Sequence, residues 1–315
     1  MEPGQRELGW LRRPFPNTIE ITAGTAVLHV RRRKMQLKQV RTWLLIGLLC
    51  FWLPSAEQNC FGEGMEYPLA VAAGPDNTLF VADRNLPGIW KIQDGKASIY
   101  FRGSKKYRTP LNAVRCLAMD MNGKLLAGDS STREIYRFDT PENPVPMTAG
   151  GIGIPTAIAI DSAGNLMVAD LELHCIFQVP AAGGKATEWV KVPAPRGLAI
   201  DSQDRVWVVS HSKEPLVRFA KDKTKEALVN NPVFEFAHQI VVDSKGDSYI
   251  TDGYAKSVWK IPAQGKPEKF FSGEPLKNPV GLAKQGESLL IADPHQKMIY
   301  SLPLTGEKTI QSVLK

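Results

Sequence analysis

Cysteine is scarce in this chain of 315 residues, which contains four. Cys50 lies in an apolar leader, so three remain beyond it, Cys60, Cys116 and Cys175, and none forms a Cys-x-x-Cys pair. An odd number this small excludes a disulfide framework and argues against a zinc site built from cysteine. The 43% of hydrophobic residues is instead that of an ordinary globular protein.

A concentrated charge of one sign is also missing from most of the chain. The sequence holds 39 basic and 32 acidic residues, a net charge of +7. Nine basic and three acidic residues fall within residues 1–56, which leaves 30 and 29 in the rest. Proteins that bind nucleic acid need a concentrated positive surface. We therefore expect no nucleic-acid partner.

Long hydrophobic runs are limited to one segment of 11 residues, residues 43–53. It is shorter than the roughly 20 residues of a membrane-spanning helix. Lys38 and Arg41 precede it, and Pro54, Ser55 and Ala56 follow, which is the pattern of a secretory signal peptide.

This pattern predicts a signal peptide over residues 35–59, cleaved near Ala56, and a periplasmic or secreted protein. The alternative is a signal anchor that stays uncleaved and holds the protein at a membrane through residues 43–53. Residues 1–34 resemble nothing foldable, and we interpret them as a mis-called or disordered N-terminal extension before a true start at Met35.

A repeat occupies the remainder. The segment PTAIAIDSAGNLMVAD, residues 155–170, aligns with five others. The six aligned segments span residues 68–83, 114–129, 155–170, 195–210, 237–252 and 279–293. Their starts are 46, 41, 40, 42 and 42 residues apart. A period in the low forties with short apolar strands predicts the blades of a β-propeller.

The predicted fold is therefore all-β, a six-bladed β-propeller of four-stranded blades that occupies residues 60–315. Repeats 3, 4 and 5 carry a turn that begins at an aspartate, Asp161, Asp201 and Asp243 respectively. Aspartate caps its own turn, whereas a calcium loop would need further oxygen ligands that are missing here. No strand is expected to be exchanged between the chain ends, so blades 6 and 1 should meet through side-chain packing.

The motifs PRGLAID (residues 195–201), GNLMVAD (164–170) and LELHCIF (171–177) resemble those of NHL repeats, and the resemblance covers about residues 65–315. The wider superfamily of such six-bladed propellers includes gluconolactonase/regucalcin-type hydrolases, strictosidine-synthase-like proteins, amidating lyases and pure binding modules. The resemblance implies the fold and leaves the activity open.

The residue that follows the proline-like position of each repeat should line the mouth of the central channel. Around the ring these residues are Leu69, Arg115, Thr156, Arg196, His238 and Val280. In gluconolactonase/regucalcin relatives this region supplies oxygen ligands for a divalent metal. Here Glu66 is the nearest matching carboxylate and two arginines stand close by, which disfavours a divalent cation.

Two arginines and a histidine favour an anion instead, because guanidinium groups offer paired donors to carboxylate or phosphate. The alternative is that Arg115 and Arg196 pair with the aspartates that end the second strand of each repeat. Those aspartates are Asp83, Asp129, Asp170, Asp252 and Asp293.

A second set of candidates follows those aspartates on the same face. It contains Arg84, His211, Tyr254 and His295 as binding residues. Repeat 4 has Ser210 in place of the aspartate, and this exception makes His211 a candidate acid or base, as His238 is. His174 occupies an ordinary position of the repeat and is interpreted as structural.

These patterns predict an exported, monomeric binding module whose top face binds a partner protein or an anionic small molecule or glycan. The alternative is a hydrolase or lyase of the gluconolactonase-like superfamily, a lactonase- or esterase-like enzyme working at the channel mouth with His211 or His238. No cofactor is predicted. A zinc site from His211, His238 and His295 is the alternative that ligand types alone allow.

Overall fold

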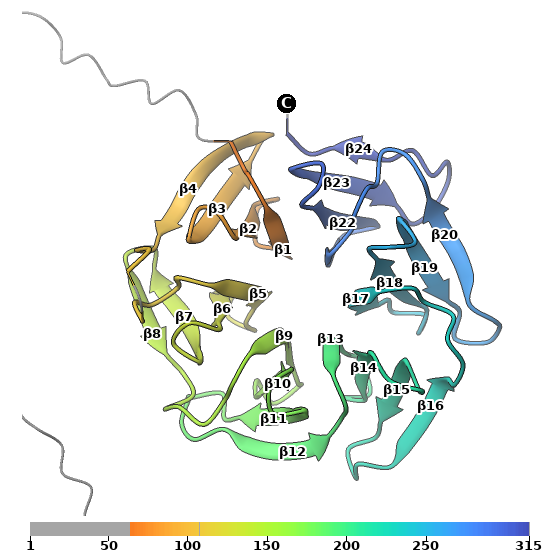
Figure 1. The fold of residues 1–315 in the computed structure, drawn as a ribbon, viewed down its shortest axis with the longest axis horizontal. Coiled ribbons are helices and arrows are strands. Elements are labelled where there is room, and N and C mark those ends of the chain that lie inside the picture. The colour runs from red at the N-terminus through yellow and green to blue at the C-terminus, as the bar shows by residue number, and fades with distance from the viewer. Residues whose placement is uncertain (1–63, 107, 315) are drawn as a thin grey trace, which may run out of the picture. The chain divides into compact units, whose positions relative to one another are not determined.

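The computed structural model describes residues 64–106 and 108–314, all within the unit of the chain that spans Gly62–Lys315. The predictions for residues 1–34 and 35–59 fall outside the described residues. Six four-stranded antiparallel sheets surround a central axis (Figure 1), so the prediction of a six-bladed all-β propeller is confirmed. In this part of the chain no helix has the length and apolar character that a membrane span requires.

Each blade contributes one strand to each of four concentric positions. The innermost strands are β1 (Pro68–Ala73), β5 (Val114–Met119), β9 (Pro155–Ile160), β13 (Pro195–Ile200), β17 (Ala237–Val242) and β21 (Gly281–Gln285). The second strands are β2 (Leu79–Asp83), β6 (Leu125–Asp129), β10 (Leu166–Asp170), β14 (Val206–Ser210), β18 (Ser248–Asp252) and β22 (Ser288–Asp293).

The outer half of each blade is less buried. The third strands are β3 (Gly88–Gln93), β7 (Glu134–Thr140), β11 (Cys175–Val179), β15 (Leu216–Phe219), β19 (Ser257–Ile261) and β23 (Met298–Pro303). The outermost strands are β4 (Lys96–Arg102), β8 (Asn143–Pro146), β12 (Thr187–Lys191), β16 (Lys225–Val229), β20 (Glu268–Ser272) and β24 (Gln311–Ser312).

The hydrophobic core lies between blades. Six clusters of buried side chains each combine residues from two neighbouring blades, so one cluster fills each seam of the ring. At the seam of blades 6 and 1, Val81 and Trp90 pack against Leu290 and Ile299. Sheets β1–β4 and β21–β24 each keep their own strands, so among the described residues this seam is closed by side-chain packing, as predicted.

The turn aspartates also act as predicted. The Oδ1 atom of Asp161 accepts the backbone N–H groups of Ala163 (3.0 Å) and Asn165 (2.8 Å). Asp201 and Asp243 accept equivalent N–H groups in their own turns. These aspartates therefore shape the hairpins between the first and second strands.

The aspartates that end the second strands hold the segment that enters each blade. Asp170 is fully buried and accepts the N–H groups of Gly153 and Ile154 (2.5 and 3.2 Å), and then those of Glu172 and Leu173 (3.0 and 2.9 Å). The carboxylates of Asp83, Asp129, Asp252 and Asp293 bind entering segments in the same way. The alternative that these carboxylates pair with Arg115 and Arg196 is wrong, because neither arginine forms an ion pair with them in the described residues.

Blade 4 shows why Ser210 can replace this aspartate. Its entering segment contains Pro193, which has no N–H group, so one of the usual donors is missing. The other donor, the Ala194 N–H, bonds to Nδ1 of His174 at 3.1 Å. His174 is thus structural, as predicted, and the exception in repeat 4 has a structural compensation.

We predict that Asp170→Asn lowers the free energy of unfolding by about 3 kcal/mol, because the amide puts donors where the backbone also donates. Urea unfolding of the purified protein measures the change. Asp94→Asn is the matched control, because Asp94 is exposed in a tight turn with φ 53°; it should change stability by less than about 0.5 kcal/mol. Equal effects at the two positions would contradict the role assigned to the buried carboxylate.

Candidate functional site

In blades 1 to 5 a β-bulge at the start of the inner strand turns side chains toward the axis. In blade 1, Pro68 pairs with Asp83 and Ala70 with Ala82, so Leu69 is an extra residue without an opposite partner. Bulges re-aim side chains in this way. The same shift occurs in blades 2, 3 and 4, where the extra residues are Arg115, Thr156 and Arg196.

Blade 5 has a longer irregularity. Ala237 pairs with Asp252 and Ile240 with Ile250, so His238 and Gln239 stand opposite Thr251 alone. Gly197 of blade 4 makes room for this bulge, since a Cβ atom there would lie 2.5 Å from the carbonyl oxygen of His238. Blade 5 consequently directs two polar side chains to the site.

These side chains surround one cavity of about 150 Å³, which we call the mouth pocket. Its lining residues are Leu69, Arg115, Thr156, Arg196, His238, Gln239 and Val280. Six of the seven are the residues that the repeat placed at the channel mouth. Gln239 was missed, because only the register of blade 5 reveals that two of its residues are displaced.

The mouth pocket carries positive charge without a lining carboxylate. The Nε atom of Arg115 donates to Ser130 Oγ at 3.0 Å. The Nε atom of Arg196 is buried and has no hydrogen-bond partner. Burial and the neighbouring charge of Arg115 lower the pKa of Arg196. Neither guanidinium forms an ion pair with any residue that the structure describes. Such a site favours an anion that supplies the missing acceptor.

Both histidines near the pocket are held neutral. Burial, Arg196 and His211 lower the pKa of His238 to about 4, and Asp252 opposes this shift. Burial also lowers the pKa of His211. His211 Nε2 lies 2.8 Å from the carbonyl oxygen of Ala237, which can only accept, so Nε2 carries the proton and Nδ1 is the unprotonated nitrogen.

Phe236 joins these groups and was not predicted. Its ring lies 4.3 Å from His211 and 5.0 Å from His238, and it stacks on Tyr254 at 4.7 Å between ring centroids. The guanidinium of Arg196 lies over the same ring at 5.5 Å. The position just before the inner strand varies between repeats, so no repeat pattern marks Phe236. Tyr254 remains 67% exposed and offers an aromatic face beside the pocket.

The remaining candidates lie elsewhere on the same face. Arg84 lies over the ring of Tyr67 at 5.7 Å, and His295 makes an edge contact with that ring at 6.4 Å. Neither lines the mouth pocket. His211, His238 and His295 therefore do not form one cluster, and no group of three or more His, Cys, Asp or Glu side chains is placed to hold a metal in residues 64–106 and 108–314.

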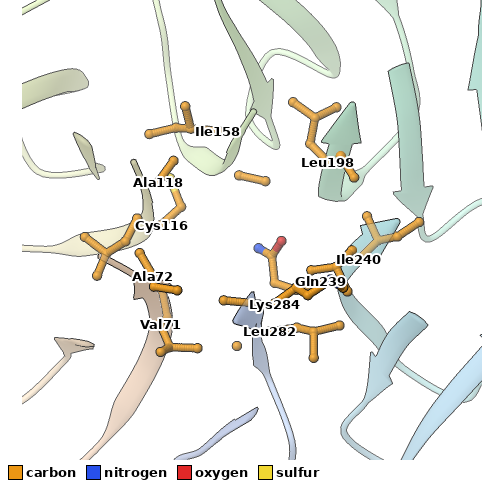
Figure 2. Close-up of a pocket in the computed structure, with 18 of the residues that line it drawn as sticks. Val71, Ala72, Cys116, Ala118, Ile158, Leu198, Gln239, Ile240, Leu282 and Lys284 are labelled. Carbon is orange, nitrogen blue, oxygen red and sulfur yellow. The ribbon is translucent and has the colours of Figure 1, made fainter. Parts of the chain in front are cut away.

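Gln239 lines the mouth pocket and also connects two blades. Its Nε2 donates to the carbonyl oxygen of Thr156 at 2.8 Å and so joins blade 5 to blade 3. The same residue lines the channel of about 310 Å³ between the inner strands. Figure 2 shows its amide reaching into the centre of that channel, among the inner-strand residues Ile158, Leu198 and Leu282. Gln239 thus lines both the mouth pocket and the channel.

Comparison with known proteins supports the fold. No protein-family model matches the chain. Mouse (Mus musculus) Teneurin-3 is 28% identical over 159 residues, which is 50% of this chain but 5% of that much longer protein.

Solved structures are more similar to this chain in fold than in sequence. A gluconolactonase from Xanthomonas campestris has a TM-score of 0.66 at 15% identity, over 77% of this chain and 87% of its own. A catalytically inactive histidine-to-alanine variant of virginiamycin B lyase from Staphylococcus aureus scores 0.59 at 17% identity, over 73% and 78%. A chain of the nidogen/laminin complex scores 0.59 at 17% identity, over 75% and 89%. These neighbours include both enzymes and a protein complex.

We predict that protonation of His238 destabilises the fold in acid. Its pKa is about 4 in the folded protein and about 6.5 when unfolded, so the unfolded chain binds more protons between these values. Stability contributed by neutral His238 is complete above pH 6.5 and is lost as the pH falls toward 4, by about 3 kcal/mol. Urea unfolding at pH 7.0, 5.5 and 4.5 tests this. Identical pH slopes for the wild type and His238→Gln would refute it.

Proposed function

We propose that this propeller is a binding module that recognises an anionic group, a carboxylate, phosphate or sulfate, at its mouth pocket. The observation that carries the proposal is the buried, unpartnered Nε of Arg196 beside a second guanidinium, Arg115. An anion there would supply an acceptor to Arg196 and offset the mutual repulsion of the two cations. Thr156 and Gln239 add neutral polar groups to the same wall.

The size of the pocket limits what enters. A cavity of about 150 Å³ accepts a small head group, so the rest of a larger ligand must lie on the face outside. The exposed ring of Tyr254, supported from behind by Phe236, is positioned to contact it. Exposed aromatic rings beside a charged pocket are typical of sites that bind proteins or sugars. The ligand is therefore either an acidic partner protein or an anionic small molecule or glycan.

Similarity to propellers found in protein assemblies supports the first of these two ligand classes. One structural neighbour was solved in a nidogen/laminin complex. A partner protein would present an acidic side chain or its C-terminal carboxylate to the mouth pocket. The proposal assigns no partner by name.

The second candidate function is an enzymatic one, a hydrolase or lyase reaction at the channel mouth. The observation that favours it is the pair of neutral histidines, His211 and His238, beside guanidiniums that would stabilise a developing negative charge. Assays with lactone and ester substrates, with and without divalent metals, decide this question. Turnover that disappears in both His211→Gln and His238→Gln would establish the enzyme. No turnover and no stabilisation by metals would favour the binding module.

We predict that phosphate, sulfate or acetate stabilises the protein saturably in thermal unfolding, because the bound anion satisfies Arg196. Arg115→Ala and Arg196→Ala should each weaken the best of these anions at least ten-fold, since each removes a charge-assisted contact worth about 1.5–3 kcal/mol. Isothermal titration calorimetry measures the affinities.

Arg84→Ala is the matched control, because Arg84 lies on the same face but outside the mouth pocket. It should leave anion affinity within about two-fold of the wild type. Equal weakening by Arg84→Ala would indicate a diffuse surface effect and contradict a localised site. Unchanged anion affinity with loss of stability alone in the two pocket variants would assign the arginines a structural role.

A further inference from the structure

A second cavity, of about 330 Å³, opens at the seam between blades 3 and 4, and we call it the seam pocket. These blades are strands β9–β12 and β13–β16 in Figure 1. The turns that follow β9 and β13 line the seam pocket, whereas the mouth pocket is lined by residues at the starts of these strands. The seam pocket therefore lies on the opposite face of the ring. Its volume is within the range of small-molecule sites.

Blade 3 departs from the repeat at one pair of facing residues in this pocket. At the equivalent place, blades 1, 4 and 5 pair an aromatic residue of the second strand with a cation of the third strand. These pairs are Phe80 with Lys91, Trp207 with Arg218 and Tyr249 with Lys260. Blade 3 has Met167 with Gln178 instead. The smaller, uncharged pair leaves room at this seam, and an exception within a repeat is a place to look for function.

Trp189 supplies an aromatic wall to the seam pocket. The pairing of β12 with β11 skips this residue, so it is an extra residue whose side chain is re-aimed by a bulge. Its half-buried ring crosses the seam and makes an edge contact with Phe219 of blade 4, at 5.9 Å between ring centroids. Met167 and Val206 line the pocket beside it. The pocket thus has one apolar side with an accessible aromatic ring.

The charged groups of the seam pocket are already engaged. Asp204 accepts the N–H and the hydroxyl group of Ser162, and it forms an ion pair with Lys221 at 2.7 Å. Asp161 accepts the backbone N–H groups of its own turn and the side-chain amide of Asn165 at 2.9 Å. A charged ligand would therefore meet groups of both signs that have partners.

Two neutral groups of the pocket remain free. Within the part of the chain that the structure describes, the Trp189 Nε1–H and the Gln178 side-chain amide form no hydrogen bond, and neither is sealed from solvent. The indole offers a donor, and the amide offers donors and an acceptor. Hydroxyl groups both donate and accept, so they can satisfy both side chains. A sugar ring combines such hydroxyls with an apolar C–H face that suits the opposite wall.

We propose that the seam pocket binds a neutral hexopyranose ring. The C–H face of the sugar lies against the apolar wall of Met167, Val206 and Trp189, and its hydroxyls bond to the free Trp189 Nε1–H and Gln178 amide. The ring is either a free sugar or one unit of a glycan chain. This inference does not depend on the mouth pocket, because Arg115 and Arg196 take no part in it.

The experiment is a titration of the ¹⁵N-labelled full chain followed through its indole N–H signals. The methyl glycosides of glucose, mannose and galactose represent the neutral ring. The Trp189 signal should shift saturably with at least one of them. Trp259 is the internal control, because its Nε1–H already donates to Asp252 at 3.2 Å. Its signal should move by less than a fifth as much.

Further ligands in the same titration define the class of sugar. Glucuronate and glucosamine, which add a charge to the ring, should bind no more tightly than the best neutral glycoside. A disaccharide that binds at least ten-fold more tightly than its single ring would assign a glycan chain as the source, and equal affinities would assign a free sugar.

Two variants give blade 3 the residues of other blades. Met167→Phe fills the pocket with the ring that blade 1 carries as Phe80, and Gln178→Lys replaces the free amide by a cation. Each should weaken sugar binding at least ten-fold. Ser301→Lys is the matched control, because Ser301 holds the equivalent place in blade 6; it should leave the affinity within about two-fold, as should Arg196→Ala.

Three results would overturn the proposal. They are a Trp189 signal that none of the neutral glycosides moves, a response to N-methylacetamide or to a charged sugar that exceeds the neutral response, and unchanged sugar affinity in both folded variants. Thermal unfolding shows whether each variant is folded. If Met167→Phe does not fold, Gln178→Lys and the wild-type titration decide.

Discussion

The capture of backbone N–H groups by a buried aspartate is the interaction on which this structure depends. In five of the six blades the carboxylate that ends the second strand binds the segment entering the inner strand and also the turn that follows. It joins two loops at one end of the blade, so the face of the ring has a defined shape. Blade 4 lacks this carboxylate. Its Pro193 has no N–H group that needs an acceptor, and the Ala194 N–H donates to His174 instead. The five carboxylates bond to backbone donors, and none of them forms an ion pair with Arg115 or Arg196 in the described residues.

The chemistry of the mouth follows from that constraint. The entering segment is fixed by the aspartate, and the bulge that comes next turns one side chain toward the axis. Arg115 and Arg196 thereby meet without a carboxylate between them, and His238 stays neutral beside them. The same capture in blade 5 positions Phe236, whose ring contacts both histidines and Arg196. The proposed anion site is therefore a direct product of how the blades are tied together.

Sequence reasoning predicted the propeller ring and most of the residues at the channel mouth, because both follow the repeat. A residue that holds the same place in six equivalent units must appear at the same radius, so six side chains were assigned to the channel mouth from spacing alone. It failed where one blade differs from the others. Gln239 reaches the pocket through a two-residue bulge specific to blade 5, and Phe236 occupies a position without a shared residue type. It also assigned the strand-ending aspartates to the arginines as an alternative, whereas their partners are backbone groups that carry no sequence signal.

The sequence by itself determined the number of blades, the four strands of each and the turns between them, because periodicity and turn chemistry are local properties. Only the tertiary structure decided which charges remain unpaired. Pairing depends on the direction of each side chain after a bulge and on contacts between blades far apart in the chain, such as that of Gln239 with Thr156, 83 residues away. For the same reason, the satisfied indole of Trp259 and the unsatisfied indole of Trp90 look equivalent in the sequence and differ in the folded ring.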